Sequence, residues 1–575
     1  MENERNWPGR ITNLAAQAGF TQLTDAEHRF LQAVRTLKYA VCGPNFNPDD
    51  KANDPRSDEQ WPQERSIRAD LIRWVCVNPT ARGQVDPQGI QLFGAAIAGE
   101  LDLSYVTVPF PITLNYCRMP DTLNLFDAHI RELDLSHSCI SNLYAYRVRI
   151  EGSLFLRYGF RASGEVRING AEIGNNLECD DGDFDNSIRA DDLKVSGSVF
   201  LRGSRARGQL RLVNAVIGSN LELDGGEFVS TKGAGGSGAG ADSFNTALNM
   251  QGVTVRGDLF LRKESSPTKK PFISHGDIEL VGAQIGGDLD CTGADIDGVL
   301  DARRVLVKGA LIWMKLAKPT ALNLRDASAY ALRDDPNSWP PKGSFWPEGF
   351  VYVSQVEDTA KARSRLEWLD RMVPFSPRPY RQLAKVLKEA GDLNGATEVL
   401  MEMERLQQSQ TILGRPVSAV LRTTVGYGYH PLWAFWELLG LAGLGWVAYR
   451  RGYRCGAMTP TEKEAYEHFK EKDSPPLYYQ RFSPLVYSIE NSLPLIKLGQ
   501  ADCWAPDPNA ESTPGLGPWK DAVGFTQIAG QCWRLLRSYT ASPSFLRGFL
   551  WVQIILGWIL ATLFAAGVTG IIHAD

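Results

Sequence analysis

The sequence predicts a multidomain protein built on a β-helix, with a helical cap before the coil and a helical hairpin and transmembrane helices after it. Three observations predict this architecture. An apolar repeat advances by about 11 residues between residues 91 and 316, helical periodicity flanks it, and two long apolar stretches follow residue 430. The chain has 575 residues, which is enough for several domains.

The repeat is clearest between residues 210 and 223, where LRL is followed by AVIG and then by LEL. Alternating apolar and polar residues indicate short strands, and a fixed short period indicates a solenoid. Two units would make one coil of about 22 residues, and the run would give on the order of eight to ten coils. A leucine-rich horseshoe is less favoured, because its Asn or Cys signature is missing. We therefore expect a pentapeptide-like β-helix.

Glycines recur at fixed positions of the repeat, where we expect them to allow positive φ at the corners of the coil. They are Gly152, Gly197, Gly218, Gly257 and Gly286.

The flanking segments have helical periodicity. Residues 1–90 are predicted to cap the first coil: Thr24 and Glu27 form a capping box for a helix to about Ala40, and a second helix covers Ser66–Val77. Residues 317–356 are rich in Pro and Trp and are predicted to be a connector. Residues 357–412 are predicted to form a tetratricopeptide-like helical hairpin.

Two stretches are apolar enough to cross a bilayer, which needs roughly 20 residues. The first membrane segment covers residues 430–450, and the second covers residues 549–572, where Gln553 is one of three polar breaks. Within the inter-span region 451–548, residues 484–499 are too short and too polar for a span. We expect them to lie at the interface or to enter the bilayer as a re-entrant segment.

The orientation in the membrane is predicted from conflicting signals. Arg450, Arg451 and Arg547 flank the inner ends of the two spans and would place the region between them in the cytoplasm. The polar N-terminus lacks the apolar run of a secretory signal, and nine cysteines without a CxxC pair suit a reducing compartment. We predict a cell-membrane protein with a cytoplasmic N-terminal half, which is compatible with the arginines if one segment is only half inserted. Impermeant labelling of Cys42 is the corresponding test.

Three short motifs match known sites in sequence but not in context. Gly233–Gly238 matches GxGxxG without the strand and helix that a dinucleotide needs, and a flexible loop is expected. Thr424–Gly428 reads TVGYG, as in potassium filters, but precedes the first span. Asp180–Asn186 lacks EF-hand spacing, and a solvated turn is expected. The sequence therefore predicts no cofactor and no metal.

Several stretches resemble a family of bacterial membrane proteins. Residues 94–103 read GAAIAGELDL, residues 379–384 read PYRQLA, residues 426–431 read GYGYHP and residues 484–488 read PLVYS. Over nearly the whole chain, the sequence resembles pentapeptide-like repeat proteins with C-terminal membrane spans, many of them labelled membrane-associated oxidoreductase. The resemblance implies the fold and membrane attachment, and it brings no catalytic residue.

Three functions follow from these features. A membrane-anchored scaffold is favoured, with membrane lipid and a protein bound to the solenoid face as partners; a homo-oligomer is also compatible. A membrane-active effector or channel gated by the cytoplasmic half is an alternative, and a redox enzyme follows from the family label alone. The sequence contains no recognisable set of catalytic residues. Its formal charge of −5 shows no excess of basic residues that would favour binding to nucleic acid. The candidate functional residues are ionisable groups at or near membrane depth: Glu437, Glu490 and Lys497.

Overall fold

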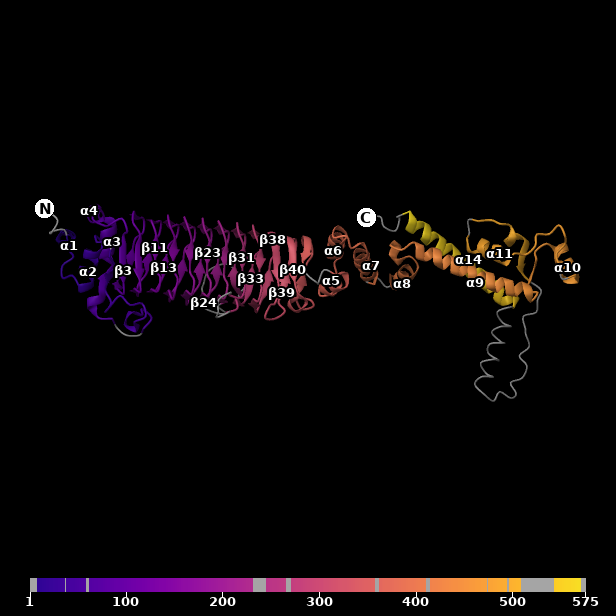
Figure 1. The fold of residues 1–575 in the computed structure, drawn as a ribbon, viewed down its shortest axis with the longest axis horizontal. Coiled ribbons are helices and arrows are strands. Elements are labelled where there is room, and N and C mark those ends of the chain that lie inside the picture. The colour runs from indigo at the N-terminus through magenta and orange to yellow at the C-terminus, as the bar shows by residue number, and fades with distance from the viewer. Residues whose placement is uncertain are drawn as a thin grey trace, which may run out of the picture. The chain divides into compact units, whose positions relative to one another are not determined.

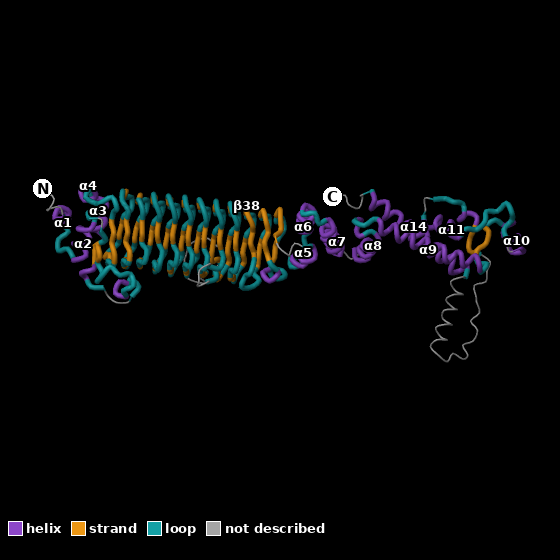
Figure 2. Tube along the Cα trace, viewed as in Figure 1, coloured by secondary structure: helices purple, strands orange, loops and turns teal. Residues whose placement is uncertain are grey.

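The computed structural model describes residues 8–36, 38–57, 61–230, 245–264, 270–356, 361–409, 414–472, 474–493, 496–507 and 542–569. The chain forms two compact units, Met1–Val399 and Leu400–Asp575, and each is described by itself. In the first unit, a stack of short strands has helices at both ends (Figure 1). In the described part of the second unit, helices predominate (Figure 2).

The first unit is a parallel β-solenoid of about 11 turns, with four strands in a typical turn. Two of the four belong to a 21-stranded sheet, one to a 10-stranded sheet and one to an 11-stranded sheet. The 11-stranded sheet takes one strand from each turn. Its strands are β5 (Leu101–Asp102), β9 (Leu123–Asn124), β13 (Leu143–Tyr144), β17 (Val166–Arg167), β21 (Ile188–Arg189), β25 (Leu210–Arg211), β29 (Thr246–Asn249), β33 (Asp277–Glu279), β37 (Val299–Asp301), β39 (Ala321–Asn323) and β41 (Phe345–Trp346).

The register confirms the predicted pairing of two 11-residue units into one turn. Val166 lies opposite Ile188, and Ile188 lies opposite Leu210, a step of 22 residues each time. The apolar template positions point inward: Leu212 and Ala215, for example, are fully buried. Stacked turns bury side chains that a single turn would leave exposed, so the core runs along the whole solenoid.

The glycines predicted to adopt positive φ do not do so. Their role is close approach: a Cβ on Gly218 would lie 2.0 Å from the carbonyl oxygen of Ser196, and a Cβ on Gly286 would lie 2.0 Å from that of Arg256. The left-handed corners are held by residues of other types, such as Tyr116 at φ 55°, and by other glycines, such as Gly170 at φ 64°. The prediction was wrong because a repeated glycine can indicate either a positive φ or a close approach of two backbones. Only the position of the neighbouring turn shows which of the two applies.

The solenoid is longer than predicted, and residues 317–356 are not a connector. This stretch contains β39, β40 (Ser328–Asp334), β41 and β42 (Val351–Val356), all of which continue the parallel sheets. The short apolar template is lost there because β38 (Leu306–Trp313) and β40 are longer strands and because large rings such as Trp313 and Trp339 fill the interior. The number of turns therefore exceeds the predicted eight to ten.

The N-terminal segment adds strands to the first turn. The capping box at Thr24 opens α2 (Asp25–Ala33), but the helix ends before Ala40 because β1 (Ala40–Val41) pairs with β3 (Ile90–Phe93). The segment predicted as one helix over 66–77 divides into β2 (Ser66–Arg68), paired with β4 (Ala96–Ala98), and α3 (Ala69–Val77). The other helices of this segment are α1 (Pro8–Gln17) and α4 (Pro79–Arg82).

A buried ion pair joins the last turns to the helices that follow. Arg365 on α5 (Ala362–Leu369) donates to Asp334 at 2.7 Å, and Trp339 Nε1 donates to the same carboxylate at 2.9 Å. On α6 (Pro377–Glu389), Gln382 Nε2 donates at 2.6 Å to the backbone oxygen of Tyr352 on β42. The end of the sheet is thus covered rather than left open. The next helix is α7 (Leu393–Ser409).

The second unit contains two helices that are long and apolar enough to cross a membrane, α9 (Leu432–Arg454) and α14 (Pro543–Val568). They overlap the predicted spans 430–450 and 549–572; residues 570–572 lie outside the described residues. The other elements are α8 (Gly414–Thr424), η5 (Gly426–Gly428), α10 (Lys463–Lys472), α11 (Pro484–Ser492), α12 (Gln500–Cys503), and the antiparallel strands β43 (Met458–Pro460) and β44 (Trp504–Pro506).

Candidate functional site

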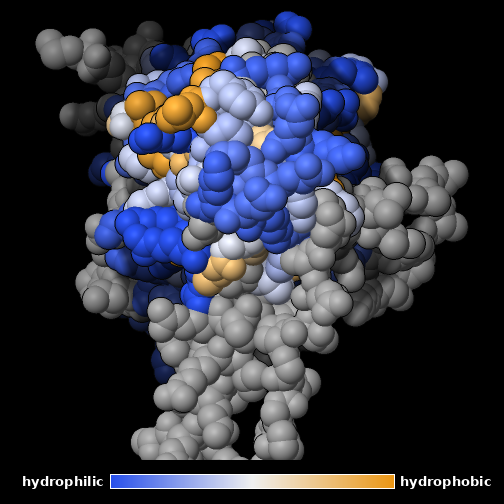
Figure 3. All heavy atoms as spheres, turned by 90° about the vertical axis from the view of Figure 1, so that its right-hand side faces the viewer, coloured by the Kyte–Doolittle hydropathy of each residue, from blue (hydrophilic) through white to orange (hydrophobic). Residues whose placement is uncertain are grey.

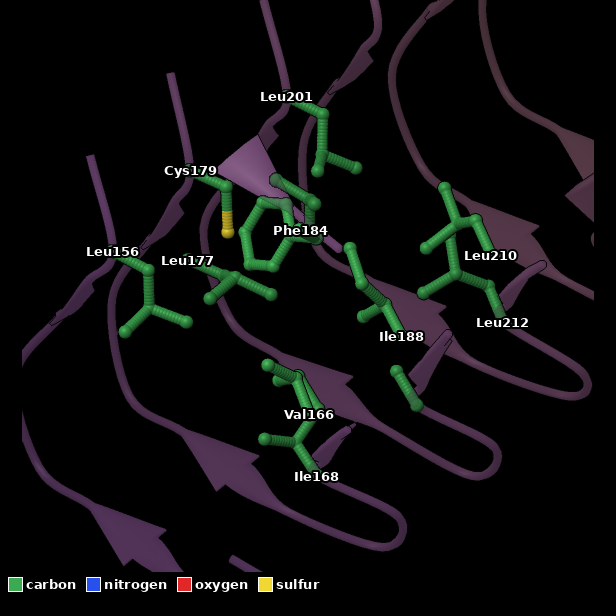
Figure 4. Close-up of a pocket in the computed structure, with 12 residues that line it drawn as sticks. Leu156, Val166, Ile168, Leu177, Cys179, Phe184, Ile188, Leu201, Leu210 and Leu212 are labelled. Carbon is green, nitrogen blue, oxygen red and sulfur yellow. The ribbon is translucent and has the colours of Figure 1, made fainter. Parts of the chain in front are cut away.

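The interior of the solenoid turns between Leu156 and Leu212 is tightly packed. The space between the side chains drawn in Figure 4 is about 10 Å³, which is at most the room for one water molecule. Every lining side chain is apolar: Leu156, Val166, Ile168, Leu177, Cys179, Phe184, Ile188, Ala190, Val199, Leu201, Leu210 and Leu212. In these turns, groups that could bind a ligand lie on the outer surface.

Charged side chains beside the 21-stranded sheet pair between neighbouring turns. Arg202 lies 2.5 Å from Asp180, and Arg262 lies 2.9 Å from Asp224. Arg202 also covers the ring of Phe200, with 4.6 Å between the guanidinium carbon and the ring centroid. Burial raises the pKa of Asp224, and Arg262 opposes this shift only in part. These groups bind one another and stabilise the stacking of the turns.

The acidic segment Asp180–Asn186 does not form a cation site. Asp180 binds Arg202, while Asp185 lies 2.7 Å from Arg161, and residues 183–184 form strand β20. Among the described residues, no group of three or more His, Cys, Asp or Glu side chains is arranged to hold a metal ion. The segment therefore continues the repeat instead of forming a separate loop.

Helices α9 and α14 pack against each other in opposite directions. A Cβ on Gly567 would lie 2.9 Å from Pro431, just before α9, and a Cβ on Gly452 would lie 2.3 Å from Leu546. The start of α9 is therefore beside the end of α14, and the end of α9 is beside the start of α14. The pair forms an antiparallel hairpin.

The short helix α11 packs against both helices of the hairpin. Ser488 Oγ donates at 2.7 Å to the backbone oxygen of Ala442, near the middle of α9. At the end of α11, the carbonyl oxygen of Ser492 would lie only 2.4 Å from a Cβ on Gly557 of α14. The three helices meet closely because glycine and serine allow their backbones to approach.

A buried polar network fixes this junction. Gln553 on α14 is fully buried; its Oε1 accepts from the Tyr449 hydroxyl at 2.6 Å. Its Nε2 donates to Ser488 Oγ at 3.0 Å and to Ser492 Oγ at 2.7 Å. Both ends of the amide therefore have partners, which a buried polar group requires in an apolar setting. The sequence marked Gln553 only as a break in a span, since its partners are about 60 to 100 residues away in the chain.

Glu490 holds the chain that returns from α11. Its carboxylate accepts four backbone N–H bonds from residues 498–501, at 2.8 to 3.0 Å. Gln500 adds two bonds at the start of the segment: its Oε1 accepts from the Ser483 amide and its Nε2 donates to the Arg481 carbonyl, both at 3.0 Å. The entry and the return of this segment are thus held together. The Glu490 carboxylate accepts from backbone donors just before α12 and from the first residues of α12, which have no partner within the helix.

The three candidate residues do not form one site. Glu490 is buried in the cradle just described, Lys497 is exposed on the returning chain, and Glu437 is exposed on α9. Residues 494–495, within the predicted re-entrant stretch 484–499, lie outside the described residues. What the helices do bring together is the Gln553 network and the Glu490 cradle. The two share α11 as their common element.

Of the two other motifs noted in the sequence, TVGYG lies within the described residues and GxGxxG does not. TVGYG begins at the last residue of α8, and its glycines form η5 directly before α9, with Tyr427 buried. It therefore lies outside the hairpin, at the entry that the sequence predicted. Gly233–Gly238 lies outside the described residues.

The comparisons with known proteins give no match: no protein-family model fits the chain, and neither a curated protein nor a solved structure is significantly similar to it.

Proposed function

We propose that this protein is a membrane-anchored solenoid scaffold. The observation that carries the proposal is the pattern of α14, which buries the polar side chain of Gln553 and exposes large apolar side chains. Gln553 is buried, whereas Ile555 and Trp558 on the same helix are more than half exposed. Such a distribution suits a lipid environment, where polar groups must find partners within the protein.

The finer features of the fold belong to the same proposal. The N-terminal segment with α2 and α3 acts as a cap for the first turn, and α5 and α6 act as a tetratricopeptide-like pair that covers the last. The solenoid is of the pentapeptide-like kind, which its four short strands per turn and 22-residue step support. Capped ends leave the sides of the solenoid as the available binding surface.

Carbonate extraction tests the anchor. Membranes from cells that express the full chain are washed at alkaline pH, and the protein is expected to stay in the pellet because more than one apolar helix is inserted. A matched variant carries Ile555→Lys and Ile559→Lys on the outward side of α14 and should appear in the supernatant or be degraded. Recovery of the wild-type protein in the wash would contradict membrane insertion.

Thiol labelling tests the orientation, and Cys455 replaces Cys42 as the reporter. Cys42 is 4% exposed, and burial raises its pKa to about 12, so it would stay unreactive on either side of the membrane. Cys455 is exposed directly after α9. We place the N-terminal half in the cytoplasm, because its described thiols are unpaired. If α9 crosses the bilayer completely, Cys455 then lies outside, although Arg450 and Arg451 favour the cytoplasmic side by the positive-inside rule.

A Cys503→Ser, Cys532→Ser variant leaves Cys455 as the exposed thiol of the second unit. An impermeant maleimide is expected to label it in intact cells, whereas Glu100→Cys on the solenoid should react only after permeabilisation. If position 100 reacted in intact cells and Cys455 reacted only after permeabilisation, the orientation would be the reverse of the one proposed. Protection of both sites in intact cells would contradict a spanning hairpin.

A protein partner fits the last turns of the solenoid, where exposed apolar residues gather on the 21-stranded sheet. Leu306 and Val351 lie on either side of Ser328 in register, and Tyr330 and Val353 are 60% and 52% exposed. The double variant Tyr330→Asp, Val353→Asp places charges on this apolar surface. It should abolish the adduct that crosslinking in cells forms between the chain and its partner protein. Tyr105→Asp, at an exposed tyrosine of an early turn, should retain it. An adduct unchanged by the double variant would place the partner elsewhere, and a homo-oligomer would give an adduct of twice the chain mass.

A channel-like effector is the second candidate, and the packing of α11 against the middle of α9 favours it. A half-inserted helix with a returning chain is a common arrangement of pore elements. Liposomes that contain the purified protein would be tested for ion flux, and Lys497→Gln would be tested for a change in ion preference. Absence of flux would remove this candidate and leave the scaffold.

The redox alternative rests on the family resemblance alone. A purified protein without visible absorbance and without bound nicotinamide or flavin would remove it.

A further inference from the structure

Basic side chains gather where α11 enters and leaves the helical hairpin. Arg450 and Arg454 belong to the end of α9, Arg481 precedes α11, and Lys497 follows it. All four are exposed, and none makes an ion pair with another described residue. Arginines on the outside of the solenoid, such as Arg202, differ because they form ion pairs with carboxylates of neighbouring turns.

The structure holds these cations at one end of the hairpin. The rings of Tyr453 and Phe482 lie 4.9 Å apart, which places Arg481 beside the end of α9. Gln500 bonds the Arg481 carbonyl, and Glu490 fixes residues 498–501, which follow Lys497 directly. Three separate chain segments therefore present positive charge at the same end of the unit.

Apolar side chains accompany the cations. Arg450 lies 5.4 Å over the ring of Trp446, and Leu485 and Ile496, which are close to Arg481 and Lys497 in the chain, are also exposed. In the space-filling view from the side of α10, the surface is mostly hydrophilic (Figure 3). A belt of Trp, Leu and Arg next to a polar surface is the composition found at the lipid headgroup level.

We propose that Arg450, Arg454, Arg481 and Lys497 form a binding site for the phosphate headgroup of an anionic phospholipid. The inference rests on the proposed membrane insertion. Charge complementarity selects the ligand. Four cations that have no ion pair among the described residues attract anionic lipid at headgroup depth, while the apolar neighbours contact its chains. The Glu490 cradle and Gln500 position two of the cations and make no contact with the lipid themselves.

The test uses the full chain in detergent, titrated with short-chain phosphatidylglycerol, short-chain phosphatidylcholine or inorganic phosphate. Thermal unfolding of the second unit is the readout, since a ligand that binds the folded state raises the midpoint. Phosphatidylglycerol should raise it most. Each substitution among Arg450→Gln, Arg454→Gln and Arg481→Gln should weaken the apparent affinity about fivefold, the equivalent of about 1 kcal/mol.

The control variant removes a charge at the opposite end of the hairpin, by Arg422→Gln on α8, and should keep the preference for phosphatidylglycerol. An equal shift from inorganic phosphate would show a site for free anions and overturn the lipid assignment. A wild-type protein that resists carbonate extraction but shows no preference between the two lipids would overturn only this inference. A protein released by carbonate would overturn the membrane proposal as well.

Discussion

Gly557→Ala is expected to destabilise the helical unit by about 1–3 kcal/mol, although alanine ordinarily favours a helix. A Cβ at this position would lie 2.4 Å from the backbone oxygen of Ser492. A backbone atom cannot rotate away as a side-chain end can, so α11 must shift. The shift would also stretch the bond of 2.7 Å between Gln553 Nε2 and Ser492 Oγ.

Gly548→Ala is the matched control on the same helix, because nothing lies within 4 Å of its Cβ position. It should leave stability unchanged or raise it by up to about 1 kcal/mol. Both variants would be unfolded by added dodecyl sulfate in mixed micelles and followed by far-ultraviolet circular dichroism. Equal midpoints for the two variants would show that α11 does not pack against α14 as described.

Asp334→Ala is expected to cost about 3–5 kcal/mol, because it removes the buried carboxylate that pairs with the buried guanidinium of Arg365. The two side chains are 2% and 0% exposed. The substitution also removes the acceptor of the Trp339 indole N–H. Thermal unfolding of the solenoid should therefore begin at its C-terminal end, where α5 would detach.

Asp370→Ala is the control, since its partner Lys342 and Asp370 itself are both largely exposed. Its effect should stay below about 1 kcal/mol. The double variant Asp334→Leu, Arg365→Met should recover much of the lost stability, because apolar residues can replace a buried ion pair. A small loss in Asp334→Ala would mean that the last turns are stable without α5.

The solenoid could be predicted from the sequence because its contacts repeat. Leu210 and Leu221 both face the interior and occupy the same position in successive repeat units. A pattern that is visible within 14 residues therefore describes how turns 22 residues apart pack on one another. The prediction failed where the repeat changes its form. Around Trp313 and Trp339 the interior is filled by large rings and the strands lengthen, and the template no longer applies although the sheets continue.

The junction of the helical unit could be predicted only in part. The apolar length of α9 and α14 is local information, but the partners of Gln553 are not. The sequence indicated Glu490 as an ionisable group near membrane depth without showing that residues 498–501 surround its carboxylate. Such roles depend on how three helices meet, and no short-range pattern encodes that meeting.

The central claim is that the hairpin of α9 and α14 lies within lipid and anchors the solenoid. The most direct measurement attaches a fluorophore to Ile555→Cys in nanodiscs and measures quenching by nitroxides on the lipid chains. The same fluorophore at Glu100→Cys on the solenoid serves as the aqueous reference. Strong chain-depth quenching at residue 555 and none at residue 100 is the expected result; accessibility of residue 555 to a water-soluble quencher, with no quenching from the lipid chains, would contradict the account.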